Sequence, residues 1–229
     1  MSVSKLLFIL VFFIFVASLP YILEKHNNQD NFYESNAYVK IYSEKAGVQG
    51  TAVHIGEGFF LTSYHIFGAS KDTQNIISYD GEKRSVNFVA GFKEYDVSLY
   101  RSEYTNLDYL NLDCSPLEIG DELISAGYAG RVGLIYNNLS VAKKSTIDIT
   151  SLDIKELVLV EGIILKGMSG GPVISKDSGY LRGLNAGIYK IPVSINQFTG
   201  QPILSYSGMS FIVEGKTICS ILDTFLQNS

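Results

Sequence analysis

Hydrophobic positions follow two different patterns along this chain. Between Leu6 and Leu23 lie 18 consecutive residues without a charge. As a helix they would span about 27 Å, close to the thickness of a bilayer core. Lys5 and the amino terminus precede this run, so the positive-inside rule predicts a cytoplasmic N-terminus and export of the residues that follow. We expect residues 1–23 to form a single-pass transmembrane signal anchor; the alternative is a cleaved signal peptide.

After a polar stretch at 24–34, which predicts a tether, the pattern changes to that of β-strands. Short runs rich in Val, Ile, Tyr and Phe alternate with Gly, Asn, Asp and Ser, which is typical of strands separated by turns. Strands are expected near 36–43, 48–55, 58–63, 74–79, 84–92 and 96–101, and again near 121–128, 132–142, 156–164, 171–175, 180–190 and 204–213.

These two groups of six strands predict an all-β fold with two six-stranded antiparallel barrels inside one domain at 35–229. The expected bounds are about 36–101 for barrel one, 102–119 for a polar linker and about 120–213 for barrel two. A C-terminal helix is predicted at 216–227, because its apolar residues recur at helical spacing. These residues are Ile218, Ile221, Leu222 and Phe225.

Composition narrows the function classes. The chain is 46% hydrophobic and 18% charged, which supports a sizeable core and argues against disorder or a coiled coil. Its net charge of −5, without a block of like charges, argues against nucleic-acid binding. Two cysteines and three histidines give no basis for a zinc site, and the acidic residues lack the compact spacing of metal ligands. We expect no metal and no organic cofactor.

Three separate segments fit one chemistry. A hydrophobic strand ends at His65, Asp96 opens an apolar strand, and the string KGMSGGPV places Ser169 in a turn of small residues. A serine nucleophile needs a base, histidine is that base near neutral pH, and a carboxylate orients the imidazole. The amides of Gly167 and Ser169 are placed to bind the developing oxyanion. The order His65, Asp96, Ser169 therefore predicts acyl transfer.

Each segment also has a plainer interpretation when taken alone. A histidine after a strand is most often structural, aspartate is common where strands begin, and the glycine-rich string also suits a simple hairpin. An esterase of the α/β-hydrolase type is a further alternative. That fold needs the order Ser–Asp–His and a helix after the serine, whereas a β-run follows Ser169 here.

The sequence over about 36–225 resembles the chymotrypsin-like (trypsin-like) serine proteases, and among them the HtrA/Deg-type protease domain, here without a PDZ domain after it. GTAVHIGEGFFLTSYHIF is similar to the stretch around the family's catalytic histidine, YDVSLY to its aspartate motif, and GMSGGPVIS to its nucleophile motif. The resemblance implies a chymotrypsin-like fold. It also implies that His65 is the general base, Asp96 its partner and Ser169 the nucleophile, with Gly167 and Ser169 forming the oxyanion hole.

The same resemblance implies a substrate-binding surface. RGLNAGI is similar to the strand that pairs with the substrate backbone, and GMSFIV to a wall of the primary specificity pocket. Ile163, six residues before Ser169, matches the pocket floor; an apolar floor disfavours Arg and Lys, so we expect cleavage after small or medium aliphatic residues. The expected substrate-binding residues are Ile163, Asn185, Ala186, Gly187, Met209 and Phe211.

Two positions depart from the family. Met168 stands where Asn or Asp is usual before the nucleophile, so activation by a salt bridge to a newly cut N-terminus is not expected. Tyr64 replaces the usual residue before the histidine. These departures keep an alternative open, namely a binding or sensor module with the protease fold and little or no turnover.

The resemblance places Cys114 of the linker near Cys219 of the final helix. They are expected either to form one disulfide or to remain two free buried thiols. The expected location is extracytoplasmic (periplasmic, luminal or extracellular), with a membrane contact through residues 6–23 and a protein or peptide as substrate. The sequence leaves open whether the chain forms a homo-oligomer.

Overall fold

The computed structural model describes residues 35–68, 70, 72–103, 106–144 and 154–227. The predicted anchor at 1–23 and tether at 24–34 lie outside this described part. Within it, no helix has the length and hydrophobicity that a membrane crossing requires.

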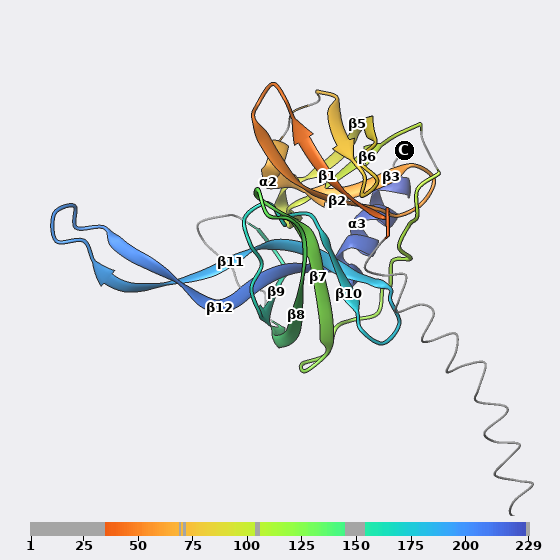
Figure 1. The fold of residues 1–229 in the computed structure, drawn as a ribbon. Coiled ribbons are helices and arrows are strands. Elements are labelled where there is room, and N and C mark those ends of the chain that lie inside the picture. The colour runs from red at the N-terminus through yellow and green to blue at the C-terminus, as the bar shows by residue number, and fades with distance from the viewer. Residues whose placement is uncertain (1–34, 69, 71, 104–105, 145–153, 228–229) are drawn as a thin grey trace, which may run out of the picture. The chain divides into compact units, whose positions relative to one another are not determined.

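The first barrel consists of β1 to β6 and closes through pairing of β1 with β4. Its strands run antiparallel in the order β1-β2-β3-β6-β5-β4 (Figure 1). Alternate residues such as Val39, Ile41, Phe60 and Ile76 point inward and form its core, as expected for strands with one buried face. The strands are β1 (Tyr38–Ser43), β2 (Val48–His54), β3 (Phe59–Ser63), β4 (Gln74–Ile77), β5 (Lys83–Phe92) and β6 (Val97–Arg101).

The second barrel consists of β7 to β12 and closes through pairing of β7 with β10. Its antiparallel order is β10-β11-β12-β9-β8-β7. The strands are β7 (Glu122–Ala129), β8 (Gly133–Lys144), β9 (Leu157–Glu161), β10 (Pro172–Ser175), β11 (Leu181–Ile195) and β12 (Pro202–Glu214). The prediction of two closed six-stranded antiparallel barrels is confirmed.

A C-terminal helix, α3 (Gly215–Gln227), follows the second barrel. Its buried residues Ile218 and Ile221 belong to a core cluster that also contains residues of both barrels, such as Leu61 and Leu181. A disulfide joins Cys219 of α3 to Cys114 of the linker, with a Cα–Cα distance of 5.8 Å and a sequence separation of 105. In the chain-entropy account, a loop of this length stabilises the fold by up to about 4–5 kcal/mol.

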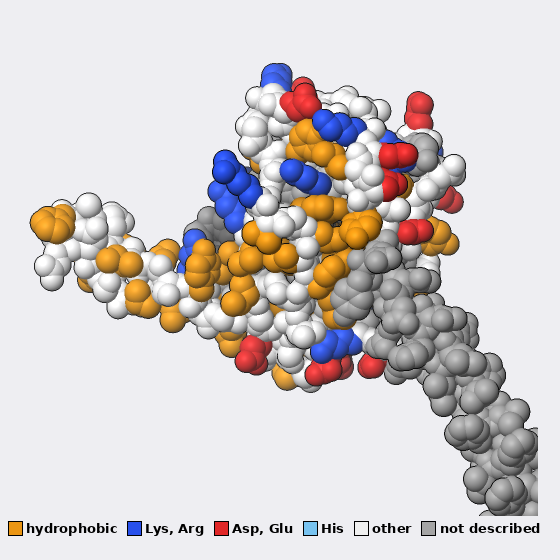
Figure 2. Space-filling model, viewed as in Figure 1, with side chains coloured by type: hydrophobic (Ala, Val, Ile, Leu, Met, Phe, Trp, Pro, Cys, Tyr) orange, Lys and Arg blue, Asp and Glu red, His pale blue; other side chains and the backbone are white. Residues whose placement is uncertain are grey.

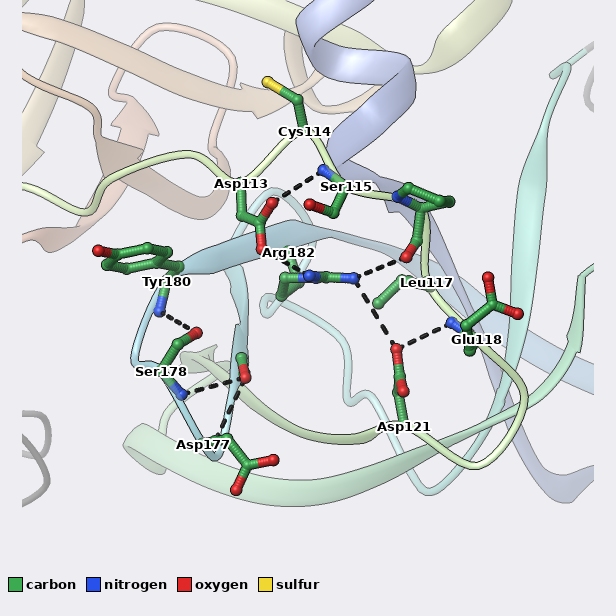
Figure 3. Close-up of polar contacts among 12 residues, drawn as sticks. Asp113, Cys114, Ser115, Leu117, Glu118, Asp121, Asp177, Ser178, Tyr180 and Arg182 are labelled. Carbon is green, nitrogen blue, oxygen red and sulfur yellow. Dashed lines mark hydrogen bonds and ion pairs between the residues drawn. The ribbon is translucent and has the colours of Figure 1, made fainter. Parts of the chain in front are cut away.

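Ion pairs connect the linker to β11 near Cys114 (Figure 3). The Arg182 guanidinium donates to Asp113 Oδ2 at 2.5 Å and to the Pro116 carbonyl at 3.0 Å, and it lies 3.8 Å from Asp121 Oδ2. Burial acts to raise the pKa of Asp113, but hydrogen bonds from Ser115 and from Arg182 together hold that pKa below its usual value. The linker is therefore tied to β11 by charge-assisted hydrogen bonds.

The structure departs from the predicted strand ends most clearly at β11 and β12. Both strands continue past the barrel and pair with each other as far as Ile195 and Pro202, so that a two-stranded ribbon projects from the second barrel (Figure 1). The prediction ended the first of these strands near 190 and began the second near 204. Pro192, Asn196 and Gly200 are residues typical of loops. The sequence around them gives no indication that the two strands continue as a hairpin.

Candidate active site

His65 is placed by the end of a buried strand. Strand β3 ends at Ser63, which is the N-cap of the short helix α2 (Tyr64–Phe67). The main chain of this turn is bound to the next predicted site residue: Tyr64 N donates to the Asp96 carbonyl at 3.0 Å and His65 N to Asp96 Oδ1 at 2.8 Å. The His65 side chain is 45% exposed, so part of its ring is accessible to solvent.

Asp96 is buried and lies against the ring of His65. Its Oδ1 and Oδ2 lie 3.0 Å and 2.8 Å from His65 Nδ1. A carboxylate accepts, so the Nδ1 proton faces Asp96 and the neutral ring keeps Nε2 as an acceptor. Asp96 caps the 3-10 turn η1 (Lys93–Tyr95) with a φ of 57°, a left-handed conformation that costs free energy for a residue other than glycine.

The loop around Ser169 depends on glycine at Gly167. This residue has a φ of +98°, and a Cβ there would lie 2.5 Å from the Tyr128 carbonyl oxygen and 2.8 Å from Gly130 N. Glycine alone combines this φ with such a close approach of two backbone segments. The loop is therefore pressed directly against the end of β7.

Three successive carbonyl groups of this loop are held by hydrogen bonds. The Gly167 carbonyl accepts from Thr51 Oγ1 at 2.9 Å, and the Ser169 carbonyl accepts from Thr51 N at 2.9 Å. Between them, the Met168 carbonyl accepts from Asn185 Nδ2 at 3.2 Å. Thr51 belongs to barrel one and Asn185 to barrel two, so both barrels fix the orientation of these peptide groups.

The amides of the same loop divide into two sets. Those of Met168, Gly170 and Gly171 donate to protein carbonyls. Those of Gly167 and Ser169 have no acceptor among the described residues. Because an oxyanion needs two converging N–H donors that nothing else occupies, the arrangement suits the binding of a negatively charged oxygen beside Ser169.

Met168 anchors the loop through its side chain. It is fully buried in the core of the second barrel, together with Ile164 and Val173. Its sulfur accepts a hydrogen bond of 3.3 Å from the Leu165 amide, and Met168 N donates to the Leu165 carbonyl at 3.0 Å. A thioether in the apolar core of the second barrel therefore anchors the residue that precedes Ser169.

Asn185 is a buried junction and its side chain does not face solvent. Its Oδ1 accepts from Ser125 Oγ at 2.8 Å, and its Nδ2 donates to the carbonyls of Ala126 and Met168. Its own carbonyl accepts from Gly170 N at 2.8 Å and from Ser63 Oγ at 3.1 Å. The side chain of this predicted substrate-binding residue is therefore bonded within the protein, and its strand role in backbone pairing with substrate stays a prediction.

This junction connects the segment before His65 to the loop that carries Ser169. Ser63 is two residues before His65, Gly170 is one residue after Ser169, and both donate to the same Asn185 oxygen. Among the described residues, no hydrogen bond joins Ser169 Oγ to His65 Nε2. Such bonds are often long in enzymes without substrate and tighten when substrate binds.

Apart from Ile163, which follows β9, the predicted specificity residues lie within the paired part of β11 and β12, where Gly187 pairs with Phe211. Ile163 is 47% exposed, and its carbonyl accepts from Asn137 Nδ2 at 2.8 Å. Ala186 and Phe211 are buried, and Phe211 packs edge-on against Tyr189 with ring centroids 5.5 Å apart. Met209 is half-buried against the central core. The strand side chains are thus mostly buried, whereas Ile163 is open to solvent.

A second histidine, His54, is structural. It is buried, its Nδ1 lies 2.8 Å from the Asp108 carbonyl, and its Nε2 accepts from Gly58 N at 3.2 Å. These partners require the neutral ring with its proton on Nδ1. Burial lowers the pKa of His54, and hydrogen bonds to the backbone at Asp108 and Leu107 offset only part of this effect.

Sequence reasoning missed Thr51, Ser63 and the clamping role of Asn185. Thr51 contacts the loop that carries Ser169 across 116 residues of sequence, and Ser63 contacts Asn185 across 122. A threonine or serine within a strand carries no local mark of such contacts.

Comparisons with known proteins agree with this architecture. The profile of the trypsin-like peptidase domain family matches residues 50–184. A probable periplasmic serine endoprotease, DegP-like, from Chlamydia muridarum (strain MoPn / Nigg) is 23% identical over 147 residues, 63% of this chain and 29% of that protein. The chain therefore spans less than a third of the length of this relative.

Solved structures share the fold at low sequence identity. The HtrA-type protease AlgW with a tripeptide gives a TM-score of 0.71 at 20% identity, covering 88% of this chain and 64% of AlgW. The inactive form of the Rv3671c protease from M. tuberculosis gives 0.67 at 17% identity, covering 86% of this chain and 93% of that chain. Since the family profile covers more than half of the sequence, the chain belongs to the family of trypsin-like peptidase domains.

Proposed function

We propose that this chain is a serine endopeptidase that hydrolyses peptide bonds through an acyl-enzyme on Ser169. The observation that carries the proposal is the pair of N–H groups at Gly167 and Ser169, which have no acceptor among the described residues, whereas the amides of Met168, Gly170 and Gly171 donate to protein carbonyls. The hydrogen bonds between His65 and Asp96 support the same chemistry. Family membership alone supports a protease but names no residue roles.

In the proposed mechanism, His65 Nε2 removes the Ser169 hydroxyl proton as Oγ attacks the substrate carbonyl carbon. The carbonyl oxygen becomes an oxyanion held by the Gly167 and Ser169 amides, while Asp96 stabilises the imidazolium. The C–N bond then breaks and His65 gives its proton to the leaving amine. Water repeats the sequence on the ester, releasing the acid and free Ser169.

The proposed substrates are proteins or peptides cut after small or medium aliphatic residues. The solvent-open Ile163 near the loop supports this preference, because an apolar wall offers a basic side chain no ionic partner. The proposed setting is extracytoplasmic, with residues 1–23 as an anchor or signal peptide and 24–34 as a tether. The disulfide between Cys114 and Cys219 suits an oxidising compartment, and the DegP-like relative is named as periplasmic.

A second function stays in view, namely a binding or sensor module with little or no turnover. Two features favour it: Met168 is unusual, and no hydrogen bond joins Ser169 Oγ to His65 Nε2 within the described part of the chain. A fluorophosphonate probe distinguishes the two functions, since it reacts only with an activated serine. We expect stoichiometric labelling of the full-length protein and of a Ser140→Ala control, and none of Ser169→Ala. Absence of labelling in all three proteins would reject the endopeptidase and favour the sensor.

A further inference from the structure

The ribbon formed by residues 189–208 of β11 and β12 is the most apolar exposed surface of the described chain. Eight of the 17 exposed large hydrophobic side chains among the described residues lie on it, with Ile195 69% and Phe198 99% exposed. Figure 2 shows them as orange side chains along the projecting ribbon. The eight are Tyr189, Ile191, Val193, Ile195, Phe198, Ile203, Leu204 and Tyr206.

Charge is almost absent from this surface. No acidic residue occurs between Asp177 and Glu214, and Lys190 is the only charged residue of the ribbon, although 18% of the whole chain is charged. A two-stranded ribbon is at best marginally stable in water by itself, and an exposed apolar patch of this kind marks an interaction site. The ribbon is therefore expected to gain stability from a bound partner.

The ribbon is continuous with the strand that borders the proposed nucleophile. On the side of β11 away from β12, Asn185 exchanges hydrogen bonds with the nucleophile loop: Gly170 N donates to the Asn185 carbonyl and Asn185 N to the Gly171 carbonyl. Beyond Ala186, β11 has no strand partner on that side among the described residues. The open edge therefore begins beside Ser169 and leads directly onto the ribbon.

Further exposed apolar residues connect the loop to the base of the ribbon. Ile163 and Leu165 are 47% and 39% exposed and lie a few residues before Ser169. Gly162 N donates to the Gly208 carbonyl at 2.9 Å, which places this segment against the ribbon base. Apart from Lys166 and Lys190, residues 162–169 and the ribbon carry no charge.

We propose that the ribbon is a docking surface for the extended, apolar part of a polypeptide substrate that precedes the scissile bond. This proposal rests on the proposed function for the place of the scissile bond. A peptide that lies antiparallel to β11 with its scissile carbonyl at Ser169 has its earlier residues alongside the later residues of β11. Between Ile188 and Ile195 the strand is about 23 Å long. This length is enough to contact the substrate residues that lie four or more positions before the scissile bond.

Side-chain burial is the expected mode of recognition on the ribbon. Pro192 has no N–H to donate to another strand. The register of β11 with β12 also shifts near Pro192 and near Ile188. Both features interrupt the regular addition of a further strand. The same features oppose edge-to-edge pairing with a second copy of the chain. A second copy over Ile163 and Leu165 would also close the approach to Ser169.

A lipid surface fits the ribbon less well than a polypeptide does. The tip has Asn196, Gln197, Thr199 and Gln201 around Phe198, whereas the aliphatic residues lie along the middle of the strands. Binding to a bilayer surface favours several basic residues next to the apolar ones, and Lys190 is the only charged residue of the ribbon. An extended apolar peptide instead covers the strand sides, where Ile191, Val193 and Leu204 lie.

Binding to the full-length Ser169→Ala protein tests the proposal without turnover. The probes are two fluorescent twelve-residue peptides, each with an aliphatic residue directly before the proposed scissile bond. They differ only at positions four to nine before that bond, which carry Val, Ile and Leu in one peptide and Ser, Thr and Gln in the other. We expect at least tenfold tighter binding of the apolar peptide by fluorescence anisotropy. The variant Ile191→Thr, Val193→Thr, Ile195→Thr, which retains β-propensity, should reduce this ratio to about one.

The matched control replaces three exposed apolar residues elsewhere, Val48→Thr, Ile119→Thr and Val132→Thr, and should keep the tenfold ratio. A second variant, in which Asn-Gly replaces residues 192–204, tests the ribbon independently of the three side chains and should also reduce the ratio to about one. An unchanged ratio in both ribbon variants would overturn the proposal. The proposal would also be overturned if the ribbon variants lost a dimer in sedimentation, or lost binding to vesicles of neutral and anionic lipid, while the peptide ratio stayed the same.

The outcome is separable from the proposed catalytic function. If the wild-type chain does not react with a fluorophosphonate while the ribbon variants lose the peptide ratio, the endopeptidase fails and the docking surface stands. If labelling succeeds and the ratio is unaffected by the ribbon variants, the enzyme stands and the docking surface fails.

Discussion

The hydroxyl of Thr51 donates a hydrogen bond of 2.9 Å to the carbonyl oxygen of Gly167 across 116 residues of sequence. The same hydroxyl accepts a hydrogen bond from Tyr128 N at 2.9 Å, and the amide of Thr51 binds the Ser169 carbonyl. One side chain of barrel one therefore orients the loop of barrel two that carries the proposed nucleophile. The geometry of that loop depends on the joining of the two barrels.

We predict that Thr51→Val lowers kcat on a peptide substrate by about 10- to 100-fold with little change in KM. The substitution is nearly isosteric, but it leaves the Gly167 carbonyl and the Tyr128 amide without their partner, which costs about 1–3 kcal/mol. Thr51→Ser should retain most of the activity. The control is Thr217→Val in α3, which removes a buried hydroxyl that donates to Glu156. It should lower stability only. An equal loss of kcat in Thr217→Val would contradict the positioning role.

Gly167→Ala is expected to reduce the rate of fluorophosphonate labelling by at least about 100-fold. The new methyl group would lie 2.5 Å from the Tyr128 carbonyl oxygen, so the loop must shift and one donor of the proposed oxyanion hole moves away; removal of one such donor costs about 10²–10³ in kcat. Gly179→Ala is a matched control, because its φ of +73° is similar and a Cβ there meets nothing within 4 Å. An equal loss of labelling in both variants would show that backbone strain alone explains the effect.

Substitutions at Met168 test how the loop is anchored. Met168→Leu conserves volume and should cost less than about 1.5 kcal/mol of unfolding free energy, while labelling slows because the Leu165 amide loses its sulfur acceptor. Met168→Asn places an amide in the apolar core and should cost more stability, at about 1–3 kcal/mol. Denaturant midpoints and labelling rates provide both readouts. Faster labelling by Met168→Asn than by the wild type would contradict anchoring by packing.

The unfolding free energy should fall as the pH is lowered through the histidine range because of His54. Burial depresses its pKa in the folded protein, so the unfolded chain binds this proton first. Stability therefore declines from about pH 6.5 down to the lower pKa of the folded protein, with a slope of at most about 1.4 kcal/mol per pH unit. Above pH 7 this contribution is fully present. Denaturant unfolding between pH 7.5 and 5 measures it, and His54→Gln should show a smaller decline. Parallel curves for the two proteins would exclude His54 as the source.

Local pattern predicted the barrels well, because each strand has one buried face. Val39 and Ile41 of β1 or Leu123 of β7 alternate with outward residues, and this period of two is visible in the sequence without knowledge of any partner strand. The His65 and Ser169 segments stood out for a similar reason, since strand ends and glycine turns are local features. Their roles in the chemistry remain predictions for the labelling experiment.

The sequence by itself thus determined the two barrels, the C-terminal helix and the three segments that bear His65, Asp96 and Ser169. Only the tertiary structure decided that Thr51 and Asn185 hold the loop that carries Ser169, and that β11 and β12 continue as a ribbon. A hydrogen bond across more than a hundred residues depends on which strands the closed barrels bring together, and no local preference encodes it. Strand extension through Pro192 likewise depends on pairing with β12, which overrides the turn-forming tendency of the residues themselves.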